Sequence, residues 1–248
     1  MKKIAYANAV ADDKVRRFVP PVRVVRESAG VSDSAALLDG VHTQSFVHFN
    51  PRECVLPPGG EIILDFGLEL HGLLTVTTGC MKLSRARITF GESVSETLGT
   101  PTQDHAIHQE LLSLPQLGQV NFGQTAFRFV RLEIPADAPE VRLIGVVATA
   151  IYRDWEYRGT FLSDDERLNR IWEVGAYTVH LNCQDYIYDG VKRDRLVWMG
   201  DLYPEIRTIL AAFDETALVE KSLDFVRDHT PDDKWMNTAS SYSCWWVI

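Results

Sequence analysis

Residues 163–172 read Ser-Asp-Asp-Glu-Arg-Leu-Asn-Arg-Ile-Trp, and here the sequence changes from a strand pattern to a helix pattern. Ser163 followed by Glu166 has the spacing of a capping box, in which each side chain bonds the other residue's backbone N–H at a helix start. Apolar and small residues then recur at helical spacing: Leu168, Ile171, Trp172, Gly175 and Val179. The pattern predicts a helix from Ser163 to about Leu181.

Two more helices are expected after this one. Pro204 to Phe213 can form a helix with proline in its first turn, where the missing N–H costs nothing. Asp214-Glu215 then opens a third helix, which carries Leu218, Leu223 and Phe225. Helix follows helix without an intervening strand, so the last third of the chain is predicted to be helical.

Before residue 155 the pattern is that of β-strands. Residues 84–90 alternate, with one face formed by Ala86, Ile88 and Phe90 and the other by Arg85, Arg87 and Thr89. Such alternation is typical of a half-buried antiparallel strand. Further strands are expected at residues 61–66, 73–78, 126–134 and 141–152, separated by turns rich in Gly and Pro. Short strands at this spacing predict an antiparallel β-sandwich.

Composition narrows the class of protein. The chain has 248 residues, with 25 Lys and Arg against 34 Asp and Glu, so its net charge of −9 argues against nucleic-acid binding. Its apolar runs fall short of the ~18–20 residues of a membrane helix. Residues 1–13 lack a secretory apolar core, so we expect a cytoplasmic protein, or a periplasmic or extracellular one if the true start lies upstream. The four cysteines have no CxxC spacing and are expected to be reduced, without a zinc site.

The segment that carries chemistry joins the first two predicted helices. Residues 185–201 read Asp-Tyr-Ile-Tyr-Asp-Gly-Val-Lys-Arg-Asp-Arg-Leu-Val-Trp-Met-Gly-Asp. Carboxylates accept hydrogen bonds from sugar hydroxyls, Arg donates to sugar oxygens, and Trp covers the apolar face of a sugar ring. A charged, solvated loop between helices would have a similar composition, and residue types alone do not decide between the two interpretations.

This segment resembles the signature of the α-L-rhamnosidases, a family of inverting glycoside hydrolases, which reads approximately Asp-Cys-Pro-x-Arg-Asp-Glu-Arg-Leu-Gly-Trp-x-Gly-Asp. The right-hand part of the signature matches Arg195, Leu196, Trp198, Gly200 and Asp201, and its first Asp matches Asp189. The segment between these two matches is one residue shorter in this chain. Aligned from the right, Asp194 takes the position of the family's general-acid Glu. Aligned from the left, Arg193-Asp194 match Arg-Asp and that Glu is missing. We adopt the first alignment because it keeps the longer match.

The resemblance extends over most of the chain. Other matching segments, in the family's order, are residues 64–72, 88–96, 127–131 and 159–172. It implies a β-sandwich domain at residues 1–155, a linker at 156–162, and the N-terminal part of an α/α toroid at 163–248. A toroid of twelve helices, with ~12 residues per helix and ~5 per connection, needs on the order of 200 residues. We therefore expect the chain to be a fragment that is inactive by itself.

The resemblance also implies roles for five residues. Asp194 would be the general acid, Asp189 and Asp201 would hold rhamnose hydroxyls, Arg193 would assist, and Trp198 would form part of the pocket wall. The expected reaction is hydrolysis of terminal α-L-rhamnosyl units with inversion and without a cofactor, on a rhamnose-containing glycoside or polysaccharide. The family's general base is a Glu on a later helix, and no position here matches it. A non-catalytic carbohydrate-binding protein and a toroid enzyme for another sugar remain alternatives.

Two further motifs have a structural interpretation. Asp104-His-Ala-Ile-His108 could bind a metal, but it lies in a β-domain connection without a third ligand nearby. Gly91-Glu-Ser-Val-Ser-Glu96 could suggest a nucleophilic serine, but it lacks the Gly-x-Ser-x-Gly pattern. We assign neither motif to catalysis.

Overall fold

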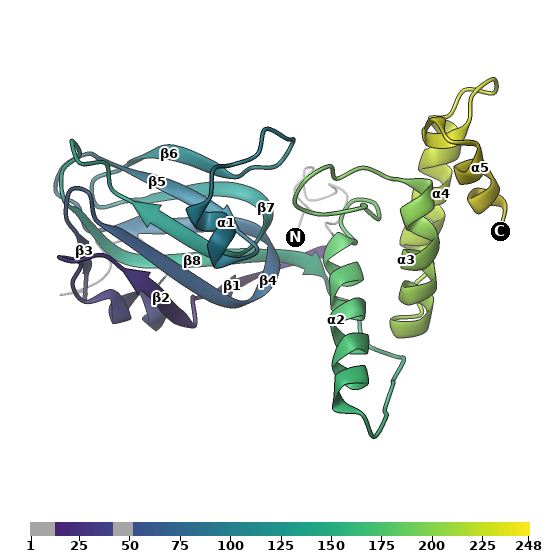
Figure 1. The fold of residues 1–248 in the computed structure, drawn as a ribbon, viewed down its shortest axis with the longest axis horizontal. Coiled ribbons are helices and arrows are strands. Elements are labelled where there is room, and N and C mark those ends of the chain that lie inside the picture. The colour runs from purple at the N-terminus through teal and green to yellow at the C-terminus, as the bar shows by residue number, and fades with distance from the viewer. Residues whose placement is uncertain (1–12, 42–51) are drawn as a thin grey trace, which may run out of the picture. The chain divides into compact units, whose positions relative to one another are not determined.

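The computed structural model describes residues 13–41 and 52–248, which form two compact units (Figure 1). The sheet unit consists of the described part of Arg16–Ile151 together with Val191–Asp194. The helical unit consists of Tyr152–Gly190 and Arg195–Ile248, with residues 13–15. Residues 1–12, on which the expectation about a leader rests, lie outside the described residues. Across the described ranges, no helix has the length and apolar character needed to cross a membrane.

The sheet unit is built on an eight-stranded sheet with the order β1-β8-β4-β7-β5-β6, in which β2 pairs with β4 and β3 with β8. Strand β4 runs antiparallel to β2, β7 and β8, β5 runs antiparallel to β6 and β7, and β3 runs antiparallel to β8. The strands are β1 (Lys14–Val19), β2 (Arg23–Glu27), β3 (Cys54–Leu56), β4 (Glu61–Thr78), β5 (Ser84–Gly91), β6 (Gln109–Leu114), β7 (Gln119–Glu133) and β8 (Val141–Arg153). The unit also holds a 3₁₀ helix, η2 (Ser34–Asp39), and a short helix, α1 (Val94–Leu98).

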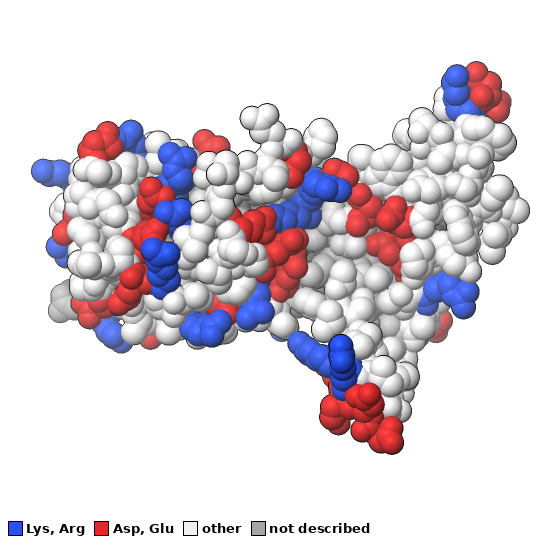
Figure 2. Space-filling view, in the orientation of Figure 1, with Lys and Arg blue, Asp and Glu red and all other residues white. Residues whose placement is uncertain are grey.

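Strand β5 confirms the alternation seen in the sequence. Ala86, Ile88 and Phe90 are completely buried, and the Phe90 ring stacks on Phe122 and packs against Phe127. Burial of this face stabilises the sheet because apolar area leaves water. On the face of the molecule drawn in Figure 2, Lys and Arg are interspersed with Asp and Glu over the sheet unit.

Strand β4 corrects one expectation. Residues 61–66 and 73–78 are not separate strands, because β4 continues through Gly67. Gly67 has a φ of 87°, and the register with β7 shifts between Asp65 and Leu70. A glycine in the left-handed region lets a strand bulge and bend instead of ending. The strands expected at residues 126–134 and 141–152 lie in β7 and β8. Strands β1, β2, β3 and β6 are not predicted from the sequence, because they are too short or too polar to show a clear alternation.

The helical unit contains α2 (Glu166–Asn182), α3 (Met199–Ala212), α4 (Ala217–Asp228), a 3₁₀ turn η4 (Met236–Thr238) and α5 (Ser240–Val247). The predicted combination of an antiparallel β-domain with a succession of helices is therefore confirmed. Its core is a cluster of buried side chains from the helices and from the α2–α3 loop: Cys183, Ile187, Val197, Met199, Leu202, Ile209, Leu218, Val219 and Val226.

Three helix starts differ from the prediction. Helix α4 begins at Ala217 with Thr216 as its N-cap, instead of at Asp214-Glu215, because Asp214 has a left-handed backbone with a φ of 58°. The N-cap of α2 is Asp165, whose Oδ1 accepts the Arg167 N–H at 2.8 Å, while the Ser163 hydroxyl accepts the Asp165 N–H instead. Helix α3 begins five residues before Pro204, which therefore lies inside the helix. A proline there removes one backbone hydrogen bond, but packing of the apolar face of a helix contributes more than a single bond.

Candidate active site

The α2–α3 connection is closed at its base by Asp189. The Asp189 N–H donates to the Leu196 carbonyl at 3.0 Å, and the Leu196 N–H donates back to Asp189 Oδ1 at 2.9 Å. This two-way bridge holds the ends of the intervening segment together. Asp189 therefore has a structural task in addition to the role that the resemblance implies. A carboxylate offers about four lone-pair sites, so both tasks are compatible.

Trp198 and Asp201 lie at the start of α3. Trp198 is the N-cap residue, and Asp201 lies in the first turn, where a carboxylate is favoured by the helix dipole. The side chain of Asn237 holds this end, since its Oδ1 accepts the Met199 N–H at 2.9 Å and its Nδ2 donates to the Val197 carbonyl at 3.2 Å. Sequence reasoning missed Asn237, because it lies far along the chain from the helix end that it caps.

Arg193 and Asp194 belong to the sheet unit, in the turn Val191–Asp194. The Asp194 side chain is 26% exposed, and Arg193 Nη2 donates to its Oδ2 at 3.4 Å. The chain leaves the turn through Arg195, whose φ of 53° lies in the left-handed region. Of the five predicted site residues, Asp189, Trp198 and Asp201 thus belong to the helical unit.

Glu205 is a residue that sequence reasoning missed. It lies one helical turn after Asp201 and is only 8% exposed. Asn182 Nδ2 donates to Glu205 Oε1 at 2.9 Å, and Glu205 Oε2 has no hydrogen-bond partner in the described part of the chain. Its spacing of four residues from Asp201 is the one signal that places both carboxyls on the same face of α3.

The charge state of Glu205 depends on two of the predicted residues. Burial above all, together with the negative charges of Asp201 and Asp189, raises the pKa of the Glu205 carboxyl from its ordinary 4.5 to about 8, against the opposing hydrogen bond from Asn182. Glu205 is therefore protonated at neutral pH. The helical unit thus places Asp189 and Asp201 close enough to Glu205 for their negative charges to favour its protonated form.

The helical residues match a known family. Residues 156–247 match the family model described as the bacterial alpha-L-rhamnosidase 6 hairpin glycosidase domain. The resemblance to the α-L-rhamnosidases is confirmed. The matched stretch includes the whole segment from Asp189 to Asp201, and among curated proteins no sequence matches this chain.

Solved α-L-rhamnosidases share this fold. A Klebsiella oxytoca rhamnosidase with rhamnose bound is similar with a TM-score of 0.75 and 23% identity, over 95% of this chain and 51% of that one. A rhamnosidase of Bacillus sp. GL1 has a TM-score of 0.66 and 19% identity, over 86% of this chain and 23% of that one. The Streptomyces avermitilis α-L-rhamnosidase complexed with L-rhamnose has a TM-score of 0.60 and 16% identity, over 88% of this chain and 19% of that one. The chain spans about half the length of the first and less than a quarter of the other two.

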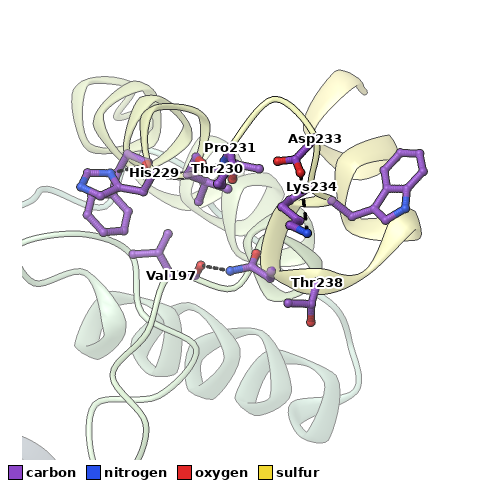
Figure 3. Close-up of a pocket in the computed structure, with 11 residues that line it drawn as sticks. Val197, His229, Thr230, Pro231, Asp233, Lys234 and Thr238 are labelled. Carbon is purple, nitrogen blue, oxygen red and sulfur yellow. Dashed lines mark hydrogen bonds and ion pairs between the residues drawn. The ribbon is translucent and has the colours of Figure 1, made fainter.

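A cavity of about 440 Å³ lies in the helical unit, and Val197 of the segment from Asp189 to Asp201 lines it (Figure 3). It is bounded by Val197 on one side and by the segment after α4, including His229, Asp233 and Lys234, on the other. The Val197 carbonyl that lines it accepts the hydrogen bond from Asn237. The five predicted site residues are not among those that line this cavity.

Proposed function

We propose that this chain carries the acid-bearing part of a glycoside hydrolase that cleaves terminal α-L-rhamnosyl units with inversion. The observation that carries the proposal is the family match over residues 156–247, which includes the segment from Asp189 to Asp201. The substrate would be a rhamnose-containing glycoside or polysaccharide, and the reaction needs no cofactor. Its general base is not assigned to a residue of this chain.

In this proposal Asp194 protonates the glycosidic oxygen as the bond to the sugar breaks. Its partly exposed side chain is accessible to a substrate, and Arg193 lies beside it. Asp189 and Asp201 accept hydrogen bonds from rhamnose hydroxyls, which need acceptors at fixed positions. Trp198 covers the apolar face of the sugar ring.

Glu205 is a less suitable acid, although it is protonated at neutral pH. A general acid must lie within hydrogen-bond reach of the oxygen that it protonates. Glu205 Oε2 is buried below the surface of the helical unit, so a glycosidic oxygen does not reach it. Its proton also excludes Glu205 as the general base near pH 7.

The test is hydrolysis of aryl α-L-rhamnosides by the protein expressed from its full reading frame. Asp194→Asn should lower kcat/KM for a poor leaving group by about 10²–10⁴-fold, the usual contribution of a general acid. Asp232→Asn, at an exposed position, is the matched control. NMR of the first-formed product should show inverted configuration. Near-wild-type turnover of a poor leaving group by Asp194→Asn would refute the acid assignment, and rhamnose binding without turnover would favour the non-catalytic alternative.

A further inference from the structure

The turn that carries Asp194 is attached within the sheet unit by a buried lysine. Lys192 is 8% exposed, and its Nζ forms an ion pair with Glu96 Oε1. Val191, the first residue of the turn, is 5% exposed. A buried ammonium group is costly unless it is paired, and removing one partner leaves the other charge uncompensated. Lys192 and Glu96 are therefore expected to stay in their paired positions.

The acceptor of this ion pair is itself held in place. Glu96 lies in the first turn of α1, where its N–H donates to the Ser93 hydroxyl at 3.2 Å and its Oε2 accepts the Glu92 N–H at 2.8 Å. Ser93 is thus the N-cap of α1, and the Glu96 carboxylate bonds back to the residue before that cap. The Gly91–Glu96 motif is therefore a helix start whose second carboxylate oxygen faces Lys192.

The histidine motif converges on the same carboxylate. His108 Nδ1 lies 3.7 Å from Glu96 Oε1, and His108 Nε2 contacts Asp104 Oδ1 at 2.8 Å. The carboxyl of Glu69 interacts electrostatically with Lys192 and Glu96. Burial and the neighbouring Glu92 raise the pKa of Glu69 to about 7, against the opposing effect of the positive charge of Lys192. Lys192 is thus part of a network of charged side chains that meet at Glu96 and come from β4, α1 and the loop after α1.

We propose that Lys192 and Glu96 are positioning residues for Asp194, which they hold in place through the turn Val191–Asp194. Asp194 lies two residues after Lys192, so few backbone dihedrals separate the anchor from the carboxyl. The left-handed Arg195 that follows is a conformation that persists only where the flanking structure enforces it. This inference rests on the proposed role of Asp194 as the acid, for which a displacement of ~1 Å can cost ~10²-fold in rate.

The test compares rhamnosides with good and poor leaving groups in the full-length protein. Lys192→Met and Glu96→Gln remove one charge each, and glutamine keeps the acceptor for the Glu92 N–H. We expect kcat/KM for the poor leaving group to fall about 10- to 100-fold and that for an activated leaving group less than threefold, because activated groups need little protonation. The double variant should be no slower than either single one, and Lys192→Arg should restore most of the activity.

Lys82→Met removes an exposed lysine from the same unit and should leave both substrates unaffected. An equal loss for both leaving groups, or no loss for the poor one, would overturn the proposal. Amide hydrogen exchange of the 248-residue chain tests the anchor without enzymatic activity, so failure of this inference can be distinguished from failure of the proposed function. Lys192→Met should speed exchange in residues 190–196 at least tenfold and leave β5 unchanged. Unchanged exchange in residues 190–196 would refute the anchor even in a protein that hydrolyses no rhamnoside.

Discussion

Glu205→Gln removes a carboxyl that the folded chain keeps protonated. The pKa of Glu205 is about 8 in the folded chain, against an ordinary 4.5. Between these two values the folded chain holds a proton that the unfolded chain has released, so the free energy of unfolding falls as the pH rises. The amide introduced by the substitution does not titrate, and its oxygen can still accept the hydrogen bond from Asn182. The variant should therefore lose this pH dependence.

The size of the effect follows from the two pKa values. At 1.36 kcal/mol for each pKa unit, the rise from 4.5 to about 8 destabilises the folded wild type by up to about 5 kcal/mol above pH 8, and by about 3 kcal/mol at pH 7. Below pH 4.5 the carboxyl is protonated in both states and contributes nothing. Glu205→Gln should thus differ little from the wild type at pH 4.5 and become more stable than it at pH 8.5.

Urea unfolding followed by tryptophan fluorescence measures this difference. All six tryptophans lie in the helical unit, so the signal follows the unit that contains Glu205. The stability gap between Glu205→Gln and the wild type should grow by several kcal/mol between pH 4.5 and pH 8.5. Glu220→Gln, at an exposed position on α4, is the control and should show no such trend. A gap that stays constant over this pH range would refute the protonated state of Glu205.

Two cap substitutions test the local structure. Asp165→Ala should destabilise the helical unit by about 1 kcal/mol, the usual cost of a lost N-cap, and Ser163→Ala should destabilise it less. If urea unfolding shows the larger loss for Ser163→Ala, Ser163 is the N-cap instead of Asp165. Asn237→Ala should cost about 1–2 kcal/mol because it removes the cap of α3 and the bond to the Val197 carbonyl, with Asn237→Asp retaining the cap. An equal melting temperature for Asn237→Ala and the wild type would contradict the assigned contact.

The local elements were predictable because their signals are local. Ala86, Ile88 and Phe90 alternate in the sequence and are buried together, since side chains in a strand point to opposite faces. The errors occur where packing overrides a local signal. Gly67 marks a bulge inside β4 instead of a strand end, and Pro204 lies within α3 instead of at its start.

The order of sheet and helices, and the segment from Asp189 to Asp201, could be identified without the structure, because hydrophobic periodicity and a contiguous motif depend only on residues that are close along the chain. The contacts between residues far apart along the chain depend on the three-dimensional packing. Glu96 reaches Lys192, and Asn182 reaches Glu205, through contacts that no spacing in the sequence encodes. Burial, and with it the protonation of Glu205, depends on what the rest of the fold places around a side chain.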